Sequence, residues 1–372
     1  MCKVDSNTKK PFVSIIVPAY NEEIIIEKNL AELCKYVKSL ESEYRWELII
    51  INDGSRDTTG DLAEAFAKDR GNVYVLHHMF NFRLGQALKF AFSKTQGDYV
   101  VVLDIDLSYS PDHIGKMLSK IRESRAKIVI ASPYRKGGNV SNVPWIRKIL
   151  STWANRFLCF MATRDVFSDK LTNITGMVRA YDGEFLRKLV LWATDIDINP
   201  EIIYKAKILH ARIVEIPAHL NWRSMESAHE GAAKRKSSLR IMRAIIQNIF
   251  SGFILRPFLF FMLPGFSLII LSLYPLVWTL IHTFSEYNMS ANQGLTFDHR
   301  LSSAIAGAFR ISPHAFIVSG FVLLLAIQLI SLGFLAYQKK RYFEELFYLG
   351  STMYKSSQIT NSIYKERKNN SS

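Results

Sequence analysis

The sequence predicts an α/β domain with a mostly parallel central sheet, followed by an amphipathic helix at a membrane surface and two transmembrane helices. Over the first two-thirds of the chain, strand-like apolar segments alternate with helix-like segments, which is the pattern of a parallel sheet covered by helices. Nearer the C-terminus, two long segments contain no Asp, Glu, Lys or Arg. The individual elements follow from the local patterns.

Several short apolar segments have the composition of buried strands. Most of them are continuous apolar runs rather than alternating ones, as expected when helices cover both faces of a sheet. The predicted strands are Val13–Pro18, Glu47–Asn52, Asn72–His77, Tyr99–Leu103, Lys127–Ala131 and Arg212–Pro217.

Helical patterns lie between these strands. Two helix starts are marked by Asp57-Thr58-Thr59 and by Ser110-Pro111-Asp112, which are typical of helix N-termini. The predicted helices are Glu22–Ser39, Thr58–Asp69, Gln86–Lys94, Pro111–Ser124, Trp145–Met161 and Pro200–Leu209.

The two uncharged segments run from Pro257 to His282 and from Ile311 to Gln338. Each exceeds the roughly 20 apolar residues needed to cross about 30 Å of hydrocarbon. We therefore predict spans at about 257–282 and 313–338, within a two-helix module at 257–338. The chain is otherwise divided into a tail at 1–11, a catalytic domain at 12–232, a juxtamembrane region at 233–256 and a cytoplasmic tail at 339–372.

The net charge of +14 would suit a nucleic-acid partner, but its distribution favours a membrane. Basic residues crowd before the first span and after the second, whereas the loop between the spans has only Arg300 and Arg310. By the positive-inside rule both flanks are cytoplasmic and the loop at 286–310 is outside. No nucleic-acid partner is expected.

In the juxtamembrane region, Leu239–Phe250 carries apolar residues at helical spacing, with polar residues on the other side. This pattern fits a helix lying on the bilayer surface, or one packed on the catalytic domain, and both readings stay open. The N-terminus does not resemble a signal peptide, and the three separated cysteines form neither a disulfide framework nor a zinc cluster.

Polar residues follow three of the predicted strands, where ligands bind in open α/β sheets. The first strand runs into Pro18, Tyr20 and Glu22, the second into Asp53, and the fourth into Asp104-Ile105-Asp106. Tyr20 offers an aromatic face to a nucleobase, and Asp53 can accept a hydrogen bond from a base N–H. Asp104 and Asp106, two residues apart on an extended strand end, should point the same way and hold Mg²⁺ or Mn²⁺ against a diphosphate. Arg83, in the loop after the third strand, could reach the same phosphates or be a solvated surface charge.

These strand-end motifs resemble those of a known enzyme family. Val-Ser-Ile-Ile-Val-Pro-Ala-Tyr-Asn-Glu-Glu at 13–23, Asn-Asp-Gly-Ser at 52–55 and Asp-Ile-Asp at 104–106 resemble the family 2 glycosyltransferases of GT-A fold. Within that family the chain is most similar to the dolichyl- or polyprenyl-phosphate sugar synthases. The resemblance implies a nucleotide-sugar site formed by Pro18, Tyr20, Glu22, Asp53, Arg83 and Asp104, with the metal on Asp104 and Asp106.

The resemblance also implies an acceptor site. In the polyprenyl-phosphate enzymes, basic and hydroxyl residues after the fifth strand grip the lipid phosphate. Arg147 and Ser151, four apart on one helical face, match that pattern, and Arg147 is the catalytic residue expected on this side.

The chain departs from the family pattern at two positions. Pro133 replaces a frequent Arg, for which Arg135 is the expected substitute, and Ser108 replaces a frequent Gln after the metal motif. Further on, Arg179, Glu201 and Arg223 resemble downstream family motifs, although Glu201 could equally be structural.

The expected reaction is inverting transfer of one sugar from a nucleotide sugar, such as GDP-mannose or a UDP-hexose, to polyprenyl phosphate at the cytoplasmic face. A phosphate monoester is mostly dianionic at neutral pH and needs no general base, and the chain lacks the family's Glu-Asp base motif, although Asp195 and Asp197 keep that option open. The alternative enzyme is a membrane polysaccharide or glycolipid synthase with a hydroxyl acceptor. A non-catalytic scaffold subunit is the alternative from another class. Homo-oligomerisation and the donor sugar stay open.

Overall fold

The computed structural model describes residues 10–143, 145–162, 171–221, 257–289 and 296–369. The chain divides into two compact units, one of residues 1–255 and 347–372 and the other of residues 256–346. The predicted helix at 239–250 and Arg223 lie outside the described residues.

The first unit is built on a seven-stranded sheet in the order β3-β2-β1-β4-β7-β5-β8. All pairs are parallel except those of β7, which is antiparallel to both of its neighbours. The strands are β1 (Phe12–Ala19), β2 (Arg45–Asn52), β3 (Val73–His77), β4 (Tyr99–Val102), β5 (Ile128–Ser132), β7 (Arg179–Asp182) and β8 (Ile213–Pro217). The expected mostly parallel sheet is confirmed, with one antiparallel strand near its centre.

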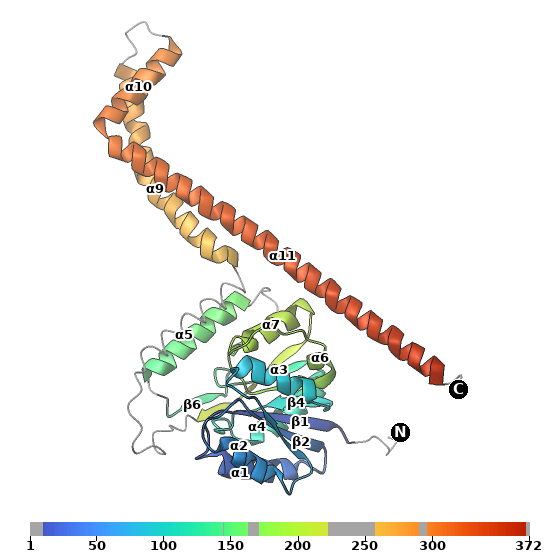
Figure 1. Ribbon diagram of the computed structural model, residues 1–372. Helices are drawn as coiled ribbons and strands as arrows, with labels where there is room; N and C mark the ends of the chain where they lie inside the picture. The colour runs from blue at the N-terminus through green and yellow to red at the C-terminus, as the bar shows by residue number, and fades with distance from the viewer. Residues whose placement is uncertain (1–9, 144, 163–170, 222–256, 290–295, 370–372) are drawn as a thin grey trace, which may run out of the picture. The chain divides into compact units, whose positions relative to one another are not determined.

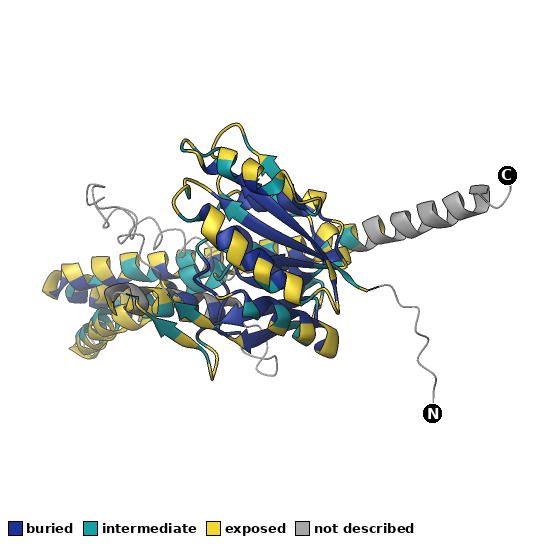
Figure 2. Ribbon diagram, turned by 90° about the horizontal axis from the view of Figure 1, so that it is seen from below, coloured by how far each residue is buried: buried dark blue, intermediate teal, exposed yellow. Residues whose placement is uncertain are grey.

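Helices cover both faces of this sheet (Figure 1). The central strands are consequently buried along almost their whole length, as the dark blue arrows in Figure 2 show. The helices are α1 (Ile26–Ser39), α2 (Thr59–Ala67), α3 (Leu84–Lys94), α4 (Asp112–Ser124), α6 (Gly183–Arg187) and α7 (Ile198–Ile208). One core combines α1 and α4 with alternate residues of β1, among them Val13, Ile15 and Val17. This burial on both faces explains why the strands lack polar alternation.

A separate two-stranded ribbon joins β6 (Asn139–Ser141) to β9 (His219–Asn221) in parallel. Helix α5 (Trp145–Ala162) follows β6 closely along the chain. Its exposed Trp145, Ile149 and Trp153 are spaced four residues apart and therefore share one helical face.

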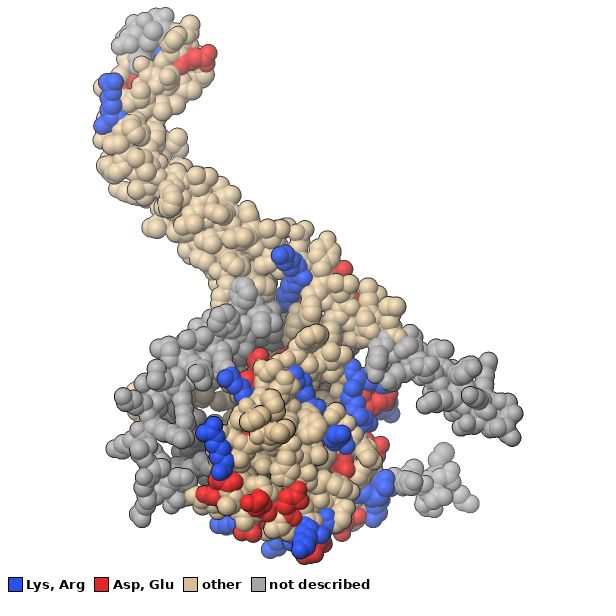
Figure 3. Space-filling view, viewed as in Figure 1, with Lys and Arg blue, Asp and Glu red and all other residues tan. Residues whose placement is uncertain are grey.

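The second unit contains α9 (Pro257–Met289), α10 (Phe297–Ile311) and the first part of α11 (Pro313–Asn369). Two helical segments, α9 and Pro313–Ser351 of α11, are each long and apolar enough to cross a membrane. On the face drawn in Figure 3, α9 and the adjoining part of α11 show few charged residues. Glycines bring these helices close together, because a Cβ at Gly265 would lie 2.8 Å from Ile330 Cγ1 and one at Gly333 would lie 2.7 Å from Met262 Cγ. Helix α10, in the loop between the predicted spans, was not expected.

Candidate active site

A cleft of about 450 Å³ lies at the carboxyl ends of the parallel strands β1, β2 and β4. It is lined by the predicted donor-site residues Pro18, Tyr20, Glu22, Asp53, Arg83, Asp104 and Asp106, together with Ala19, Asn81, Leu84, Ala87, Ile105, Met177 and Asp195. The three polar strand ends therefore meet in one place, as expected from neighbouring parallel strands.

The first two strand ends are fastened to each other by hydrogen bonds. Asn21 has a positive φ of 55°, and its backbone N–H donates to Ser55 Oγ at 3.0 Å. In return, the Arg56 backbone N–H donates to Asn21 Oδ1 at 2.9 Å. A further bond, from the Glu22 N–H to Thr59 Oγ1 at 2.8 Å, fixes the start of the loop that carries Glu22.

Asp53 is 5 % exposed and is held by two partners on one oxygen. Its Oδ1 lies 2.7 Å from His78 Nδ1 and accepts the Phe82 backbone N–H at 3.1 Å. The His78 ring is itself packed between Phe90, with ring centroids 5.3 Å apart, and Phe82, at 5.1 Å. The carboxylate is thus fixed in orientation at the cleft wall. His78 was not recognised from the sequence, because a histidine at the end of a strand carries no specific signal.

Asp104 and Asp106 both line the cleft, but the expected reason for their proximity is wrong. Strand β4 ends at Val102, and the two aspartates lie in a turn in which the Leu107 N–H donates to Asp104 O at 3.2 Å. Leu107 has a left-handed φ of 48°. The alternation of an extended strand therefore does not apply here, and the turn brings the two carboxylates together.

Ser108 determines the orientation of Asp106. Its backbone N–H donates to Asp106 Oδ1 at 2.8 Å and its hydroxyl donates to Oδ2 at 2.6 Å. Ser108, where the family often has Gln, thus supplies a hydroxyl that holds the Asp106 carboxylate.

The acidic residues of the cleft are close enough to perturb one another. Burial, the Asp106 carboxylate and the Glu22 carboxylate raise the pKa of Asp104 from 3.8 to about 7. Burial, Asp106 and Asp57 raise the pKa of Glu22 from 4.5 to about 7. In addition, Glu22 Oε2 is buried without a hydrogen-bond partner among the described residues.

This donor set fits a hard divalent cation. Partly buried carboxylates that repel one another, with an unpartnered oxygen beside them, are stabilised by a cation that prefers oxygen ligands. Among the described residues, no three His, Cys, Asp or Glu side chains form a complete metal site. A cation on Asp104 and Asp106 would therefore take further ligands from water and a bound diphosphate.

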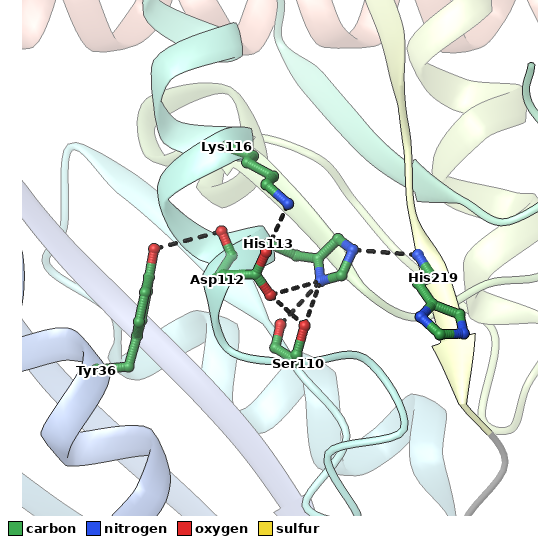
Figure 4. Close-up of polar contacts among 6 residues, drawn as sticks. All are labelled: Tyr36, Ser110, Asp112, His113, Lys116 and His219. Atoms are coloured by element: carbon green, nitrogen blue, oxygen red, sulfur yellow. Dashed lines mark hydrogen bonds and ion pairs between the residues drawn. The ribbon is translucent and has the colours of Figure 1, made fainter. Parts of the chain in front are cut away.

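The residues that follow the turn of Asp104 and Asp106 are bonded through their backbone to the β6–β9 ribbon. The Asn221 N–H donates to Ser108 O at 2.9 Å, and Tyr109 forms a bridge with Leu220. Figure 4 shows the neighbouring cluster at the start of α4, in which the buried His113 lies between Ser110 and His219. His113 Nε2 lies 3.3 Å from the His219 backbone N and Nδ1 lies 2.9 Å from Ser110 O, so this ring joins α4 to β9.

Two of the predicted acceptor residues, Arg135 and Ser151, are not among the described residues that line the cleft. Arg135 is exposed in the turn after β5, and Ser151 is exposed on α5, where the Tyr134 hydroxyl lies 3.3 Å from Ser151 Oγ. Arg147 belongs to the same helix, but its side chain lies outside the described part of the structure. The structure therefore places Ser151 beside the chain that follows β5.

Helix α5 is fastened to the domain by Asn155, which is 2 % exposed. Its Nδ2 donates to Thr172 O at 3.0 Å, and its Oδ1 accepts the Ile174 N–H at 3.0 Å. Glu215 continues this buried network, because its carboxylate accepts the backbone N–H groups of Thr172 and Asn173, each at 2.8 Å. The helix that carries Arg147 and Ser151 is thus anchored by hydrogen bonds to buried backbone.

Arg179 and Glu201, which resemble downstream family motifs, bond to backbone groups of the fold. Arg179 is fully buried in β7, where Nη1 donates to Asn199 O at 3.0 Å, and burial lowers the pKa of its guanidinium. Glu201 accepts the Trp192 and Ala193 backbone N–H groups at 2.9 Å and 2.8 Å. Asp197 Oδ1 accepts the Asp195 N–H at 3.0 Å. Of the carboxylates left open by the sequence, only Asp195 lines the cleft.

An α/β sheet with an acidic cleft at the carboxyl ends of its parallel strands is compatible with a glycosyltransferase. Comparison with known families agrees, because residues 14–190 match the model of glycosyl transferase family 2. The chain belongs to glycosyltransferase family 2, and its domain has the expected GT-A fold.

Three relatives illustrate the similarity. A dolichol-phosphate mannosyltransferase of Pyrococcus furiosus is 31% identical over 212 residues, which are 55% of this chain and 55% of that protein. A dolichyl-phosphate beta-glucosyltransferase of Trichomonas vaginalis is 26% identical over 220 residues, covering 56% of this chain and 66% of that protein. An undecaprenyl-phosphate mannosyltransferase of Micrococcus luteus is 31% identical over 211 residues, covering 55% of this chain and 82% of that protein. The chain thus spans about half the length of the first relative and two-thirds of the second.

Proposed function

We propose that the chain is an inverting glycosyltransferase that moves one sugar from a nucleotide sugar to polyprenyl phosphate. The observation that carries the proposal is the cleft in which Tyr20, Asp53, Asp104 and Asp106 meet at the strand ends. The similarity to transferases whose names specify dolichyl or undecaprenyl phosphate supports the acceptor.

In this proposal each strand end recognises one part of the donor. Tyr20, which is 38% exposed, offers its ring to the nucleobase, and the fixed carboxylate of Asp53 accepts a base N–H. Asp104 and Asp106 would hold Mg²⁺ or Mn²⁺, and a cation bound there would neutralise charge that develops on the leaving nucleoside diphosphate. Ser108 keeps Asp106 directed for that task.

The hydrogen bonds of Asp195, Asp197 and Glu201, the candidate general bases, support a phosphate acceptor. Asp197 and Glu201 are used to hold the backbone of 192–195, and Asp195 is paired with Arg83 at 3.0 Å. A hydroxyl nucleophile would need a carboxylate available to take its proton, whereas a dianionic phosphate needs positioning and charge stabilisation. Arg147, Arg135 and Ser151 are the proposed acceptor-phosphate ligands.

The proposed location is a membrane, with the catalytic unit and the C-terminus on the cytoplasmic side. The two membrane-length helices and the basic flanks before residue 257 and after residue 338 support this orientation. A lipid acceptor presents its phosphate at that surface.

The test is transfer by the full-length protein in detergent. Polyprenyl phosphate is incubated with GDP-mannose, UDP-glucose or UDP-N-acetylglucosamine and Mg²⁺ or Mn²⁺, and the lipid product and its anomeric configuration are determined. We expect one sugar per lipid with inverted configuration, and no transfer to the matching non-phosphorylated polyprenol. Asp104→Ala should lower the rate by at least about 10²-fold. Transfer to the polyprenol, or equal turnover of the variant in excess chelator, would refute the proposal.

A further inference from the structure

Arg83 and Asp195 form an ion pair that lies in the wall of the cleft. Arg83 precedes α3, and Asp195 precedes α7, more than a hundred residues later in the chain. Arg83 Nη1 donates to Asp195 Oδ2 at 3.0 Å, and both residues line the cleft together with Asp104 and Asp106. The pair therefore lies where the donor is proposed to bind.

The Asp195 side of this pair is held by a fixed segment of chain. The carboxylate of Glu201 accepts two backbone N–H groups at Trp192 and Ala193, and the almost fully buried Lys205 donates to Val190 O at 2.7 Å. The Asp195 backbone N–H is in turn bonded to Asp197. The segment 190–195 is consequently preorganised before any ligand arrives.

Close packing joins this segment to the start of α3. The Gln86 N–H donates to Thr194 O at 3.3 Å. A Cβ on Gly85 would lie 2.5 Å from the Thr194 carbonyl carbon, so glycine permits the two backbones to meet. Asp195 and the backbone of the Arg83 loop are thus held at a fixed separation.

The Arg83 side chain is the more exposed partner of the pair. Its side chain is 57% exposed, compared with 25% for Asp195. Among the described residues that line the cleft, it is the only Lys or Arg, whereas five are acidic, namely Glu22, Asp53, Asp104, Asp106 and Asp195. A guanidinium has five N–H donors, so Arg83 can keep its bond to Asp195 and still donate to a second anion.

We propose that Asp195 is a positioning residue that holds the Arg83 guanidinium inside the cleft, where Arg83 binds the diphosphate of the nucleotide sugar. This assignment rests on the proposed function. Asp195 acts as a hydrogen-bond acceptor for Arg83, and its charge is otherwise unfavourable beside a diphosphate. Holding the long side chain in place lowers the entropy lost when the ligand binds.

The proposal predicts a difference between two substitutions at the same position. Asp195→Ala removes the acceptor, and we expect the Kd of UDP or GDP to rise about 3–10-fold, as for the loss of one ordered side chain. Asp195→Asn keeps an acceptor oxygen and removes a negative charge, so the Kd should stay within about twofold of wild type or fall. Uridine and guanosine, which lack phosphates, should bind both variants as they bind wild type.

The experiment is calorimetric titration of the full-length protein in detergent with each ligand and excess Mg²⁺. Arg83→Ala and Arg83→Ala/Asp195→Ala complete a double-mutant cycle, in which the second substitution should add no further loss. A Kd for the diphosphates that is unchanged or lower in Asp195→Ala would overturn the assignment, as would equal loss of uridine or guanosine binding. If the wild type binds neither UDP nor GDP, the proposed function fails and this assignment fails with it. If the wild type binds but Asp195→Ala does not differ, only this assignment fails.

Discussion

The Ser108 hydroxyl donates to Asp106 Oδ2 at 2.6 Å while the Ser108 backbone N–H donates to Oδ1 of the same carboxylate at 2.8 Å. One residue therefore fixes both oxygens of the second aspartate of the metal motif. The lone pairs of Asp106 that face the cleft are left in a defined direction, which is what a cation ligand requires.

Replacing Ser108 by Ala removes the hydroxyl and keeps the backbone bond. We expect the concentration of Mg²⁺ or Mn²⁺ that gives half-maximal transfer to rise about 10-fold, because groups that orient metal ligands typically contribute that much to affinity. The rate at saturating cation should change much less. Ser110→Ala is a matched control, since the Ser110 hydroxyl bonds to Asp112 instead. An activation curve that does not move in Ser108→Ala would contradict the role assigned to this hydroxyl.

Asp104 should be a source of instability above neutral pH when no cation is present. Its folded-state pKa of about 7 lies above the ordinary value of 3.8, so the unfolded chain ionises first as the pH rises. Stability is therefore lost between about pH 4 and about pH 7 and the loss is complete above that range. In chelator at about pH 8, Asp104→Asn should raise the free energy of unfolding by on the order of 1–3 kcal/mol.

The measurement is the thermal midpoint of the detergent-solubilised chain at several pH values. The gain of Asp104→Asn should disappear near pH 4, since both proteins are then neutral at this position. Added Mn²⁺ should stabilise the wild type and leave the variant unchanged. A variant that is less stable than the wild type in chelator at about pH 8 would disprove this account of the acidic cluster.

Substitutions at Arg147 test the proposed binding site for the acceptor phosphate. Arg147→Ala should raise the apparent KM for polyprenyl phosphate, because a charge-assisted hydrogen bond of about 1.5–3 kcal/mol is lost. The KM for the nucleotide sugar should hardly change, since Tyr20 and Asp53 are untouched. Arg147→Lys should restore part of the loss, because a point charge replaces a planar fork. An equal rise of both KM values in micelles would show that Arg147 only supports its helix.

The orientation of the chain can be measured with membrane-impermeant thiol reagents. Cys34 and Cys159 are buried, so Cys2→Ser gives a suitable background for single cysteines. A cysteine at position 292, which comes between α9 and α10 in the sequence, should be labelled from outside intact cells. A cysteine at Ser356, in the C-terminal part of α11, should be labelled only after the membrane is permeabilised. The opposite pattern would reverse the proposed topology.

The parallel strands could be predicted because each is a continuous apolar run between helical patterns. The bounds of β1, β2 and β5 agree with the sequence to within two residues. Strand β7 could not be found in this way, because its four residues, Arg179–Asp182, include an arginine whose burial depends on partners elsewhere in the fold. The three-residue strands β6 and β9 are likewise fixed by pairing with each other rather than by local composition.

The same distinction applies to the cleft. Residues that follow parallel strands meet at one sheet edge, so Tyr20, Asp53 and Asp104 could be placed from the sequence. Met177 and Asp195 come from loops whose paths depend on specific hydrogen bonds, such as those of Asn155 and Glu201. Those bonds join segments that are distant in the sequence or lie in irregular chain, and no local pattern reports them.

The bond from the Asn221 N–H to Ser108 O has a practical consequence for making a water-soluble version of the catalytic unit. A shortened chain that stops after β8, at Pro217, would keep the seven-stranded sheet but lose β9 and with it the bridge at Tyr109. Such a protein could fold and yet present Ser108, and therefore Asp106, without its backbone support. A stop codon is safer beyond Asn221, where every residue that fixes the aspartate turn is retained.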